Sequence, residues 1–521
     1  MPRKPRPLIN RITALAFACL TSAATLIGSP VLPASADTAS VVVPAPDKQI
    51  TASSVGIQMF MWPWVSLAGE CTSQLGPQGV DWILVSPPQE DIQGSQWWTH
   101  YQPVSYKLQS QLGTEAQFAA MVSACNTAGV SVIVDAVINH MAATATSGFA
   151  GTLHEKYSYP GIYASTDFHA GLNPKDPNFC DHSIANYYDT AEVTNCELGG
   201  LADLATEKPS VRGSISGYLN HLIDLGVSGF RIDAAKHMAM PDLVAIKAAL
   251  KPVNGRSPYL LSESIGSAAL NEPYTALGDV FAWDYQQGLY QMFNGQAWRA
   301  ADPKQTAVSV GPAANTVIMV SNHDTEHHGP TAVTYREPQK FLAANAYLLA
   351  VPFGKPMLYT GYAFNNATPD VGPSAAADGT VAPAVCPAGP AALTPQKSYA
   401  SGTFICLDRW TAIGGMIGWR HQVADAPIAN FYVRQNTFAF SRGSGFFALN
   451  ASATNTKKAS SLQTQTGLPA GVYCDVISGG ASAVKAGKCA GKSVTVGADG
   501  RAKLSLPPMT AMALDAANKL R

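Results

Sequence analysis

Short apolar runs alternate with amphipathic stretches along most of the chain from residue 54 onward. Apolar residues at helical spacing predict helices over residues 114–129 and 210–226. Strands that alternate with helices are typical of a parallel sheet, and eight of them predict a (β/α)8 TIM barrel of the α/β class. The predicted strands are SVGIQMF (54–60), VDWILVS (80–86), SVIVDAV (131–137), SGFRID (228–233), YLLSES (259–264), DVFAWD (279–284), TVIMVS (316–321) and KPMLYT (355–360).

Two regions break this alternation. Residues 141–203, after the third strand, are rich in Gly, Asn, Asp, Tyr and His and show no helical period. This stretch is too long for an ordinary loop between a strand and a helix, so we expect a small excursion domain there. Residues 365–401, after the eighth strand, are dense in Ala, Pro and Gly and predict a second irregular segment.

From residue 425 the pattern changes to short alternating runs broken by Gly and Asn. Such runs predict antiparallel strands and a separate C-terminal β-sandwich. The runs are NTFAFSR (436–442), GFFALNAS (445–452), GVYCDVIS (471–478), KSVTVGADG (492–500) and AKLSLPP (502–508). We therefore expect barrel segments at 37–140 and 204–424, the excursion domain at 141–203 and the sandwich at 425–521.

The first residues are typical of a targeting segment rather than of a fold. A basic stretch (1–11) precedes an apolar stretch (12–28), and LPASA (32–36) before Asp37 resembles a cleavage site. A membrane anchor is the alternative, but the apolar stretch is short and ends in small residues and prolines. We predict a signal peptide over 1–36 and a secreted, extracellular protein.

The charge balance and the lengths of the apolar runs argue against nucleic acid and membranes as partners. The chain carries 34 basic and 35 acidic residues, a formal net charge of −1. This balance gives no electrostatic footprint for nucleic acid or anionic lipid, and it suits an uncharged substrate. No segment after the signal reaches the roughly 18 apolar residues of a spanning helix, so no membrane partner is expected. We expect a monomer.

If the protein is exported, its cysteines, nine in the whole chain, are expected to form disulfides rather than to stay reduced. Cys19 would leave with the signal, and an even number in an exported chain favours disulfides. No CxxC pair occurs, which argues against a zinc site. Spacing alone leaves about 105 pairings open for eight cysteines. Pairing of nearest neighbours is the economical hypothesis, namely Cys71–Cys125, Cys180–Cys196, Cys386–Cys406 and Cys474–Cys489.

Acidic residues occupy the ends of three predicted strands, Asp233, Glu263 and Asp324, and Asp135 lies within the third strand. Catalytic groups of such barrels sit at the C-terminal ends of the strands. A single acid there is more often a salt-bridged loop residue. Three of them beside His and Asn point to hydrolysis of a glycosidic bond, which needs one ionised and one protonated carboxyl. Adjacent fourth and fifth strands can hold two carboxyls at the ~5–5.5 Å of a retaining mechanism.

Four ordered motifs carry a family resemblance: VDAVINH (134–140), GFRIDAAKH (229–237), SES (262–264) and SNHD (321–324). They resemble the signature regions of the α-amylases of glycoside hydrolase family 13, in the group with animal and some bacterial secreted enzymes. The likeness runs from about residue 54 to 420. WWTHYQPVSYKL (97–108), NCELGGLADLATEK (195–208) and FICLDRW (404–410) extend it.

This resemblance implies endo-acting, retaining hydrolysis of α-1,4-glucosidic bonds in starch, glycogen and maltooligosaccharides. Asp233 would be the nucleophile, Glu263 the general acid and then base, and Asp324 the holder of sugar hydroxyls. Arg231, on the same strand face as Asp233, would keep that aspartate ionised. The implied substrate contacts are Arg231, Trp97, Trp98, Tyr101, Gln102, His140, Lys236, His237 and His323.

The resemblance also implies a structural Ca²⁺ that joins the excursion domain to the barrel. Its ligands would be the side chains of Asn139 and Asp203 and the main-chain carbonyls of Thr194 and His237, which are the oxygen donors that calcium prefers. Considered alone, Asn139 could equally be a helix cap and Asp203 a surface acid.

Many relatives in the animal-like group bind chloride near the catalytic acids, through two residues matched here by Arg231 and Asn322 and a basic residue on the eighth strand. Met357 stands at that third position, and a thioether cannot hold an anion. Lys355 shares the strand face but lies toward the bottom of the barrel. We predict activity that does not require chloride.

Three alternatives remain at this point. A metal-dependent barrel hydrolase would typically carry an HxH pair on its first strand, and GIQMFMW (56–62) has none. A non-catalytic carbohydrate-binding relative would be expected to lack one of the three acids. A maltooligosaccharide-forming or glucan-transferring relative differs in loop shape, which the sequence does not reveal.

Overall fold

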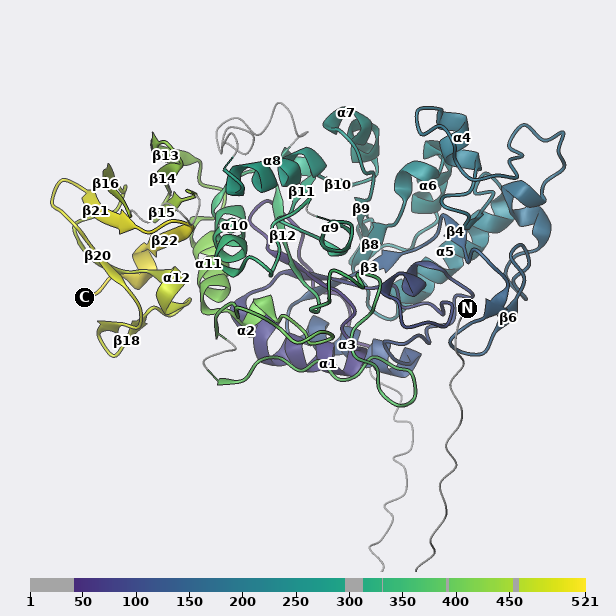
Figure 1. Cartoon of the computed structure of the whole chain (residues 1–521), viewed down its shortest axis with the longest axis horizontal. Helices are drawn as coiled ribbons and strands as arrows, with labels where there is room; N and C mark the ends of the chain where they lie inside the picture. The colour runs from purple at the N-terminus through teal and green to yellow at the C-terminus, as the bar shows by residue number, and fades with distance from the viewer. Residues whose placement is uncertain (1–41, 296–312, 330, 390–392, 453–458) are drawn as a thin grey trace, which may run out of the picture. The chain divides into compact units, whose positions relative to one another are not determined.

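The computed structural model describes residues 42–295, 313–329, 331–389, 393–452 and 459–521. Its centre is a closed barrel of parallel strands in the order β1-β12-β11-β10-β9-β8-β3-β2 (Figure 1), which confirms the predicted fold class. The barrel strands are β1 (Gly56–Met59), β2 (Trp82–Val85), β3 (Ser131–Ala136), β8 (Gly229–Ile232), β9 (Tyr259–Ser262), β10 (Asp279–Phe281), β11 (Thr316–Ile318) and β12 (Lys355–Thr360).

The barrel stays continuous across the excursion. β3 pairs directly with β8, with Asp135 opposite Arg231, although the chain between them leaves the barrel. The pairing of β1 with β12, with Gly56 opposite Met357, closes the cylinder. Every residue of β3 is buried, which explains its nearly unbroken apolar sequence, because strands covered on both faces have no polar side.

Helices between the strands cover the outside of the barrel (Figure 1). The helix predicted over 114–129 is α3 (Glu115–Thr127), and the one predicted over 210–226 is α5 (Pro209–Asp224). α3 begins with a capping box, in which Thr114 and Gln117 satisfy each other's backbone N–H groups. The other α-helices of the described barrel are α1 (Trp64–Glu70), α2 (Gly76–Gln78), α6 (Met240–Ala248), α7 (Ala268–Asn271), α8 (Trp283–Phe293), α9 (His323–His327), α10 (Pro338–Ala350) and α11 (Thr411–Val423).

The interior of the barrel is packed rather than hollow. An apolar cluster fills it, made of Trp82, Leu84, Ile133, Leu261, Phe281, Val317, Met319 and Met357. The indole of Trp82 lies against Gly56 so closely that a Cβ there would be 2.1 Å from the ring. A glycine on β1 is therefore required for this packing.

Several predicted element ends are wrong by a few residues. DVFAWD was predicted as a strand over 279–284, but β10 ends at Phe281 and Trp283 begins α8. β11 likewise ends at Ile318, before the predicted end at 321. In both places the apolar character continues from strand into the following turn and helix, so hydrophobicity does not mark the boundary.

The excursion after β3 consists mostly of turns and short elements, in agreement with its lack of a helical period. Its ends meet, because β4 (His140–Met141) pairs antiparallel with β7 (Ala202–Asp203). Between them lie β5 (Thr146–Ser147), β6 (Leu153–His154) and a short helix, α4 (Thr190–Asn195). The exact limits of the excursion domain and of the other domains remain predictions.

The C-terminal region forms two antiparallel sheets, which confirms the predicted sandwich class. One has the order β13-β14-β15-β22 and the other β16-β21-β20-β17. Their strands are β13 (Ile428–Arg434), β14 (Thr437–Arg442), β15 (Gly445–Asn450), β22 (Thr510–Asp515), β16 (Ser460–Gln465), β21 (Arg501–Leu506), β20 (Ser493–Val496) and β17 (Gly471–Cys474). The sequence analysis missed β13, β16 and β22. Trp419 of α11 donates a hydrogen bond to the Leu514 carbonyl of β22 at 2.9 Å, which connects this region to the barrel helices.

The four nearest-neighbour disulfides are all present in the structure: Cys71–Cys125, Cys180–Cys196, Cys386–Cys406 and Cys474–Cys489. The predicted signal peptide and Cys19 lie outside the described residues. Within the described part of the chain, no helix combines the length and the apolar character needed to cross a membrane.

Candidate active site

The three strand-end acids lie at one end of the barrel. β8 ends just before Asp233, β9 ends just before Glu263, and Asp324 stands in the first turn of α9, after β11. Parallel strands bring their carboxyl ends to the same edge, so these three side chains converge although 91 residues separate the first from the last (324 − 233). Asp233 and Glu263 are each 7% exposed.

A buried arginine holds this cluster together. The guanidinium of Arg231 donates from Nη1 to Asp233 Oδ1 at 2.7 Å and to Asp135 Oδ1 at 2.6 Å. Its Nη2 lies 2.5 Å from Glu263 Oε1. One cation thus contacts three carboxylates, and Asp233 and Glu263 sit on adjacent nitrogens of the same planar group.

Asp135 is a member of this cluster that the sequence analysis noted without giving it a role. It lies opposite Arg231 in the β3–β8 register. Its second oxygen, Oδ2, accepts a hydrogen bond from the Tyr101 hydroxyl at 2.8 Å. Asp135 therefore holds Arg231 with one carboxylate oxygen and Tyr101 with the other. Its signal in the sequence was a charged residue inside an otherwise apolar strand.

The backbone directly after Asp233 is also unusual. Ala234 has φ of 50° and lies in the left-handed region, which costs a non-glycine residue roughly 1–2 kcal/mol. In this conformation its N–H donates to Glu263 Oε2 at 3.1 Å. Strain of this kind persists where the surrounding contacts hold it, and here it aims a donor at a central carboxyl.

Burial and Arg231 act in opposite directions on these acids. Burial raises the pKa of Asp233, Glu263 and Asp324, and the positive charge of Arg231 opposes the rise in each. The same two causes act on Asp135, whose pKa is raised to about 7. Burial thus lets a carboxyl of this cluster keep its proton at a higher pH than it would in water, and such perturbed acids are typical of sites of acid–base chemistry.

His323 lies beside Asp324 in an aromatic setting. Its ring stacks on Phe60 at 4.8 Å and on Tyr101 at 5.2 Å between ring centroids. Nδ1 contacts Gln58 Nε2 at 2.9 Å, which leaves Nε2, 3.4 Å from Asp324 Oδ2, to carry the ring hydrogen. Burial lowers the pKa of His323 well below its usual value, so the ring is neutral.

The predicted aromatic residues lie in the turn after β2, close to this cluster. Trp97 is 5% exposed and packs against the rings of His323 and His327, whereas Trp98 is half-buried. Gln102 accepts a hydrogen bond from the Ala143 N–H at 3.1 Å. Trp97 therefore packs against the histidines of the site, and Trp98 has more of its ring exposed to solvent or to a ligand.

His140 is buried on the other side of Tyr101. Its Nε2 lies 3.0 Å from the Tyr101 carbonyl oxygen, and its Nδ1 lies 3.3 Å from Asn139 Nδ2. Burial lowers its pKa to about 4, so the ring is neutral and has one N–H. That N–H is donated to Tyr101, and a hydrogen bond to any ligand would have to replace this contact.

Lys236 and His237 follow the strained turn. Lys236 donates to the Ile265 carbonyl at 3.2 Å, and its ammonium lies 5.9 Å from the ring centroid of Tyr187, a residue of the excursion that is 53% exposed. His237 Nδ1 donates to the Val193 carbonyl at 3.1 Å. These contacts bring α4 of the excursion against the end of β8.

Two of the residues predicted to hold calcium, Asn139 and Asp203, contact each other where the excursion leaves and rejoins the barrel. Asn139 and Asp203 are both buried, and Asn139 Nδ2 donates to Asp203 Oδ1 at 3.3 Å. Burial raises the pKa of Asp203 to about 7, because a carboxylate here lacks water. His169 donates to the other oxygen, Oδ2, at 2.6 Å and reaches Glu207 at 3.1 Å. Neither of these two partners was predicted from the sequence.

This donor set fits a hard cation. It offers a buried carboxylate and an amide oxygen, which are ligands that calcium prefers, and His169 orients the carboxylate as an outer partner would. Thr194 lies in α4 next to Val193, whose carbonyl contacts His237. Asn139 thus contacts Asp203, and Thr194 follows the residue whose carbonyl contacts His237.

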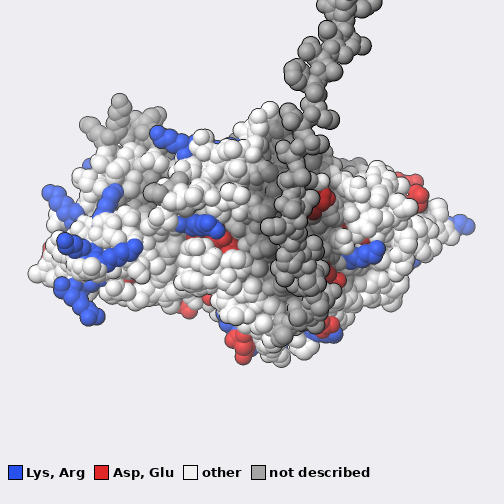
Figure 2. All heavy atoms as spheres, turned by 90° about the horizontal axis from the view of Figure 1, so that it is seen from below, with Lys and Arg blue, Asp and Glu red and all other residues white. Residues whose placement is uncertain are grey.

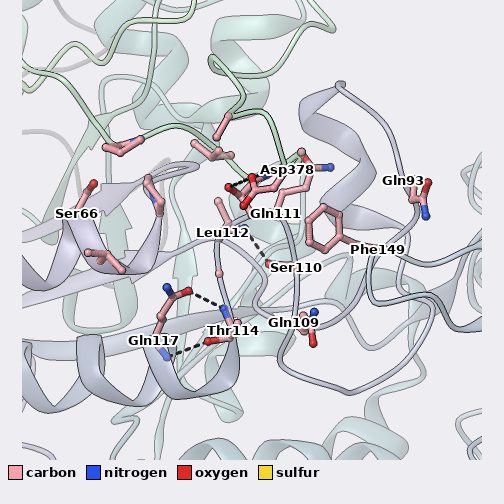
Figure 3. A pocket seen from close by; sticks show the side chains of 18 of the residues that line it. Ser66, Gln93, Gln109, Ser110, Gln111, Leu112, Thr114, Gln117, Phe149 and Asp378 are labelled. Atoms are coloured by element: carbon pink, nitrogen blue, oxygen red, sulfur yellow. Dashed lines mark hydrogen bonds between the residues drawn. The ribbon is translucent and has the colours of Figure 1, made fainter. Parts of the chain in front are cut away.

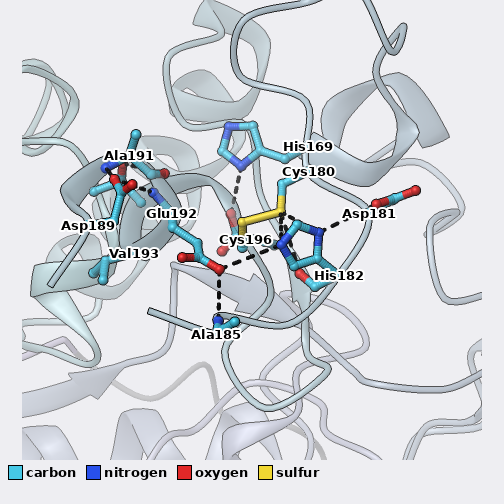
Figure 4. Close-up of a disulfide and its surroundings, with 12 residues drawn as sticks. His169, Cys180, Asp181, His182, Ala185, Asp189, Ala191, Glu192, Val193 and Cys196 are labelled. Carbon is cyan, nitrogen blue, oxygen red and sulfur yellow. Dashed lines mark hydrogen bonds and ion pairs between the residues drawn. A yellow bond between two sulfur atoms is a disulfide. The ribbon is translucent and has the colours of Figure 1, made fainter. Parts of the chain in front are cut away.

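A disulfide lies beside this junction (Figure 4). Cys180 Sγ is 3.5 Å from His182 Nδ1, and His182 Nε2 is 3.5 Å from Glu192 Oε1. Cys180, Cys196 and His182 have the proximity of a metal site. The two sulfurs are bonded to each other, however, so neither can act as a thiolate ligand.

The residues considered for an anion site are engaged elsewhere. Met357 is fully buried in the interior cluster of the barrel. Lys355 is 2.7 Å from both carboxylate oxygens of Asp279 and donates to the Ala314 carbonyl at 2.8 Å. Asn322 caps α9 by accepting from the Thr325 N–H. Arg231 already contacts three carboxylates.

Two family models match the chain. The α-amylase catalytic domain matches residues 78–258, and the α-amylase C-terminal all-β domain matches residues 432–517. An α-amylase of Streptomyces violaceus is 37% identical over 474 residues, which span 91% of this chain and 74% of that protein. An α-amylase of the beetle Tribolium castaneum is also 37% identical, over 86% of this chain and 91% of its own length.

Solved structures show the same relationship. The crystal structure of α-amylase I from the earthworm Eisenia fetida superposes with a TM-score of 0.77 at 29% sequence identity. The match covers 91% of this chain and 99% of the Eisenia chain. A glutamate-to-glutamine mutant of that protein, solved as a complex with maltohexaose, superposes equally well.

Replacing Arg231 by methionine should lower the free energy of unfolding by about 3–5 kcal/mol, because buried carboxylates lose their counter-charge. Arg231 opposes the rise in the pKa of these acids, so their pKa should rise further in the variant. A carboxyl whose pKa is higher in the folded state than in the unfolded state stabilises the fold at low pH. This contribution is lost as the pH rises through the folded-state pKa.

The deficit of the Arg231→Met variant should therefore be smaller at about pH 5 than at about pH 8, measured by denaturant unfolding against the unmodified protein. Arg256→Met is the matched control, because Arg256 and Asp47 form an exposed pair that contributes less than about 1 kcal/mol. A deficit that is equal at both pH values would contradict the charge argument.

Proposed function

The chain belongs to the α-amylase family and is a glycoside hydrolase, and on that premise we propose that Asp233, Glu263 and Asp324 perform its chemistry. The reaction is the hydrolysis of internal α-1,4-glucosidic bonds in starch, glycogen and maltooligosaccharides. A bound maltohexaose in the mutant earthworm relative supports a cleft that accepts a run of glucose units.

The observation that carries the proposal is the shared contact of Asp233 and Glu263 with adjacent nitrogens of Arg231. This contact sets the two carboxyls close together. Retaining enzymes need a separation of about 5–5.5 Å, whereas inverting enzymes need roughly 6.5–9.5 Å to admit a water molecule. The arrangement favours a double displacement with retention of configuration.

In the first step Asp233 attacks the anomeric carbon, and a covalent bond forms between that carbon and the carboxylate oxygen. The bond to the leaving sugar oxygen breaks, and Glu263 gives its proton to that oxygen. In the second step Glu263 takes a proton from water, whose oxygen displaces Asp233 from the anomeric carbon. The products are two shorter glucans, and both acids return to their first protonation states.

The surrounding residues support this division of roles. Arg231 stabilises the ionised form of Asp233, and the negative charge of Asp233 adds to burial in raising the pKa of Glu263, which favours its protonated form. Asp324 and neutral His323 face the sugar that carries the reacting carbon, where they can hold its hydroxyls in the distorted ring. Trp98, Tyr101, Gln102 and His140 supply further contacts to the substrate, and Lys236 and His237 supply contacts on the leaving side.

We further propose that Asn139, Asp203 and the carbonyls of Thr194 and His237 hold a calcium ion. Relatives of the α-amylase family generally bind calcium, and the buried donor set described above fits it. When bound, the ion neutralises Asp203 and links the excursion to the barrel. Its contribution is structural, and no step of the hydrolysis passes through it.

Four disulfides suit a protein that folds in an oxidising compartment. We propose export by the signal peptide predicted over residues 1–36, with a mature chain that begins near Asp37.

Changing Asp233 to Asn or Glu263 to Gln should lower kcat on soluble starch by at least about 10²-fold, because acid–base assistance alone typically supplies 10²–10⁴-fold. Melting temperatures should change little, because each replacement keeps the size of the side chain. Asp425→Asn, outside the cluster, is a matched control that should keep full activity. A variant of Asp233 or Glu263 with more than about a tenth of the original kcat would contradict the assigned role.

Removal of calcium should lower the melting temperature, because an ion that binds only the folded state stabilises it by mass action. Asp203→Ala should reproduce this loss and should make the melting temperature insensitive to a chelator. Asp189→Ala, which removes an exposed helix cap in the same excursion, should stay chelator-sensitive. An unchanged melting curve after metal loss, verified by elemental analysis, would refute the site.

Hydrolysis should not require chloride, because Met357 cannot hold an anion and Lys355 is neutralised by Asp279. Starch hydrolysis after exhaustive dialysis into chloride-free buffer should match that in added sodium chloride at constant ionic strength. A saturable, several-fold rise in turnover with chloride would show that Arg231 and Asn322 hold the ion by another arrangement.

A further inference from the structure

A cavity of about 870 Å³ lies outside the catalytic cluster (Figure 3). Four segments that are far apart in the sequence form it: residues 63–66 at the start of α1, residues 93–117 between β2 and the first turn of α3, Phe149 of the excursion, and residues 376–383 of the irregular segment after β12. None of Asp233, Glu263 and Asp324 lines it. Its volume lies in the range of small-molecule sites.

Several polar groups in this cavity have hydrogen-bonding capacity to spare. The side chain of Gln109 makes no hydrogen bond to a described residue, and Gln117 uses only its oxygen, to cap α3. Asp378 accepts two hydrogen bonds from Thr380 on Oδ1, and Oδ2 has no partner among the described residues. The cavity thus offers amide donors and carboxylate and amide acceptors together.

An aromatic ring lies among these groups. Phe149 is half-buried, and its ring projects into the cavity between the labelled glutamines (Figure 3). Gly379 lies beside one edge of this ring, because an added Cβ there would be 3.7 Å from Phe149 Cε2. The half-buried ring keeps part of its surface accessible, which suits stacking on a flat apolar surface of a ligand.

The lining is almost free of charge. Asp378 is the single ionisable side chain among the described residues that line the cavity. The face of the molecule seen in Figure 2 is likewise mostly uncharged, apart from grey atoms that cover part of it. Amides, hydroxyls, one carboxylate and one ring recognise a neutral ligand with many hydroxyls, and they give little attraction to phosphates or to acidic peptides.

The cavity shares a wall with the turn that carries the predicted substrate tryptophans. Gln111 donates to the Gly94 carbonyl at 2.7 Å, and the Trp97 N–H donates to the Asp370 carbonyl at 3.1 Å. Val381 N–H in turn donates to the Gln111 carbonyl at 2.8 Å. The segment that lines the cavity is therefore continuous with the turn whose Trp97 packs against His323 of the catalytic cluster.

We propose that this cavity is a second saccharide-binding site, which holds a distant segment of the α-glucan whose bond is cleaved at Asp233. The proposal rests on the proposed function for the identity of the sugar. Phe149 stacks on a pyranose ring, and Gln109, Gln117 and Asp378 bond its hydroxyls. Holding two segments of one polymer raises the effective concentration of the chain at the catalytic site, and a short substrate gains nothing from this.

Binding of maltoheptaose to the full-length Glu263→Gln variant, by isothermal titration calorimetry, tests this directly. We expect two binding events, of which one is lost when Phe149→Ala or Gln109→Ala is added. The matched control is Val433→Ala with Gln463→Ala, an exposed apolar and an exposed polar residue of the C-terminal sheets, which should keep both events. A single event at the start, or two events that persist in both cavity variants, would overturn the proposal.

The same cavity variants with Glu263 intact give an independent readout. Their kcat/KM on soluble starch should fall by at least about threefold, with unchanged kcat/KM on a chromogenic maltotrioside. An equal fall on both substrates would show a general effect on folding or catalysis and would overturn the proposal. If the unmodified protein hydrolysed neither substrate, the proposed function would fail, while the binding isotherms would still decide whether the cavity takes a saccharide.

Discussion

The contact of one buried guanidinium with three carboxylates determines the organisation of the active site. Arg231 is 2% exposed, and a charge so poorly hydrated is tolerable only with close partners. Asp135, Asp233 and Glu263 are such partners, and each in turn would be unfavourable without the cation. The four groups are thus mutually dependent, and their relative positions are fixed more firmly than pairwise hydrogen bonds on a surface would allow. This rigidity is what a reaction with two defined carboxyl positions requires.

The barrel makes the contact possible through strand register. Arg231 pairs with Asp135 of β3 on one side and with Leu261 of β9 on the other. Asp135 is therefore level with Arg231, whereas Glu263, two residues after Leu261, follows its strand at the level of Asp233. The apolar interior below, which includes Trp82 and Met357, excludes water from the floor of the site. The second buried ion pair of the barrel, Lys355 with Asp279, involves the first residues of β12 and β10, away from the catalytic end of the strands. The buried charged residues of the barrel therefore lie near the two ends of its strands, and the interior between them is apolar.

The sequence predicted those parts of the molecule that follow from local pattern. Buried parallel strands such as β3 are apolar throughout and are easily recognised, and motif order placed Asp233, Glu263 and Asp324 at one end of the barrel. Strand β16, by contrast, buries only two residues completely, Leu462 and Thr464, and its polar sequence gives a weak signal. The partners His169 of Asp203 and Tyr101 of Asp135 are each 34 residues away along the chain. Contacts between residues so far apart in the sequence depend on how the excursion and the turn after β2 fold back onto the barrel. The local pattern of hydrophobic residues carries no information about that folding.

The two-residue ladder between β4 and β7 has an evolutionary consequence. It brings His140 opposite Asp203, so the excursion leaves and re-enters the barrel at almost the same point. The entropy of closing a loop grows only slowly with its length, by about 0.6 kcal/mol for each doubling. Insertions and deletions within the excursion should therefore accumulate at small thermodynamic cost, without moving the strand ends that carry the acids. In such an architecture the cleft wall can diversify for new glucans while the chemistry below it stays constant.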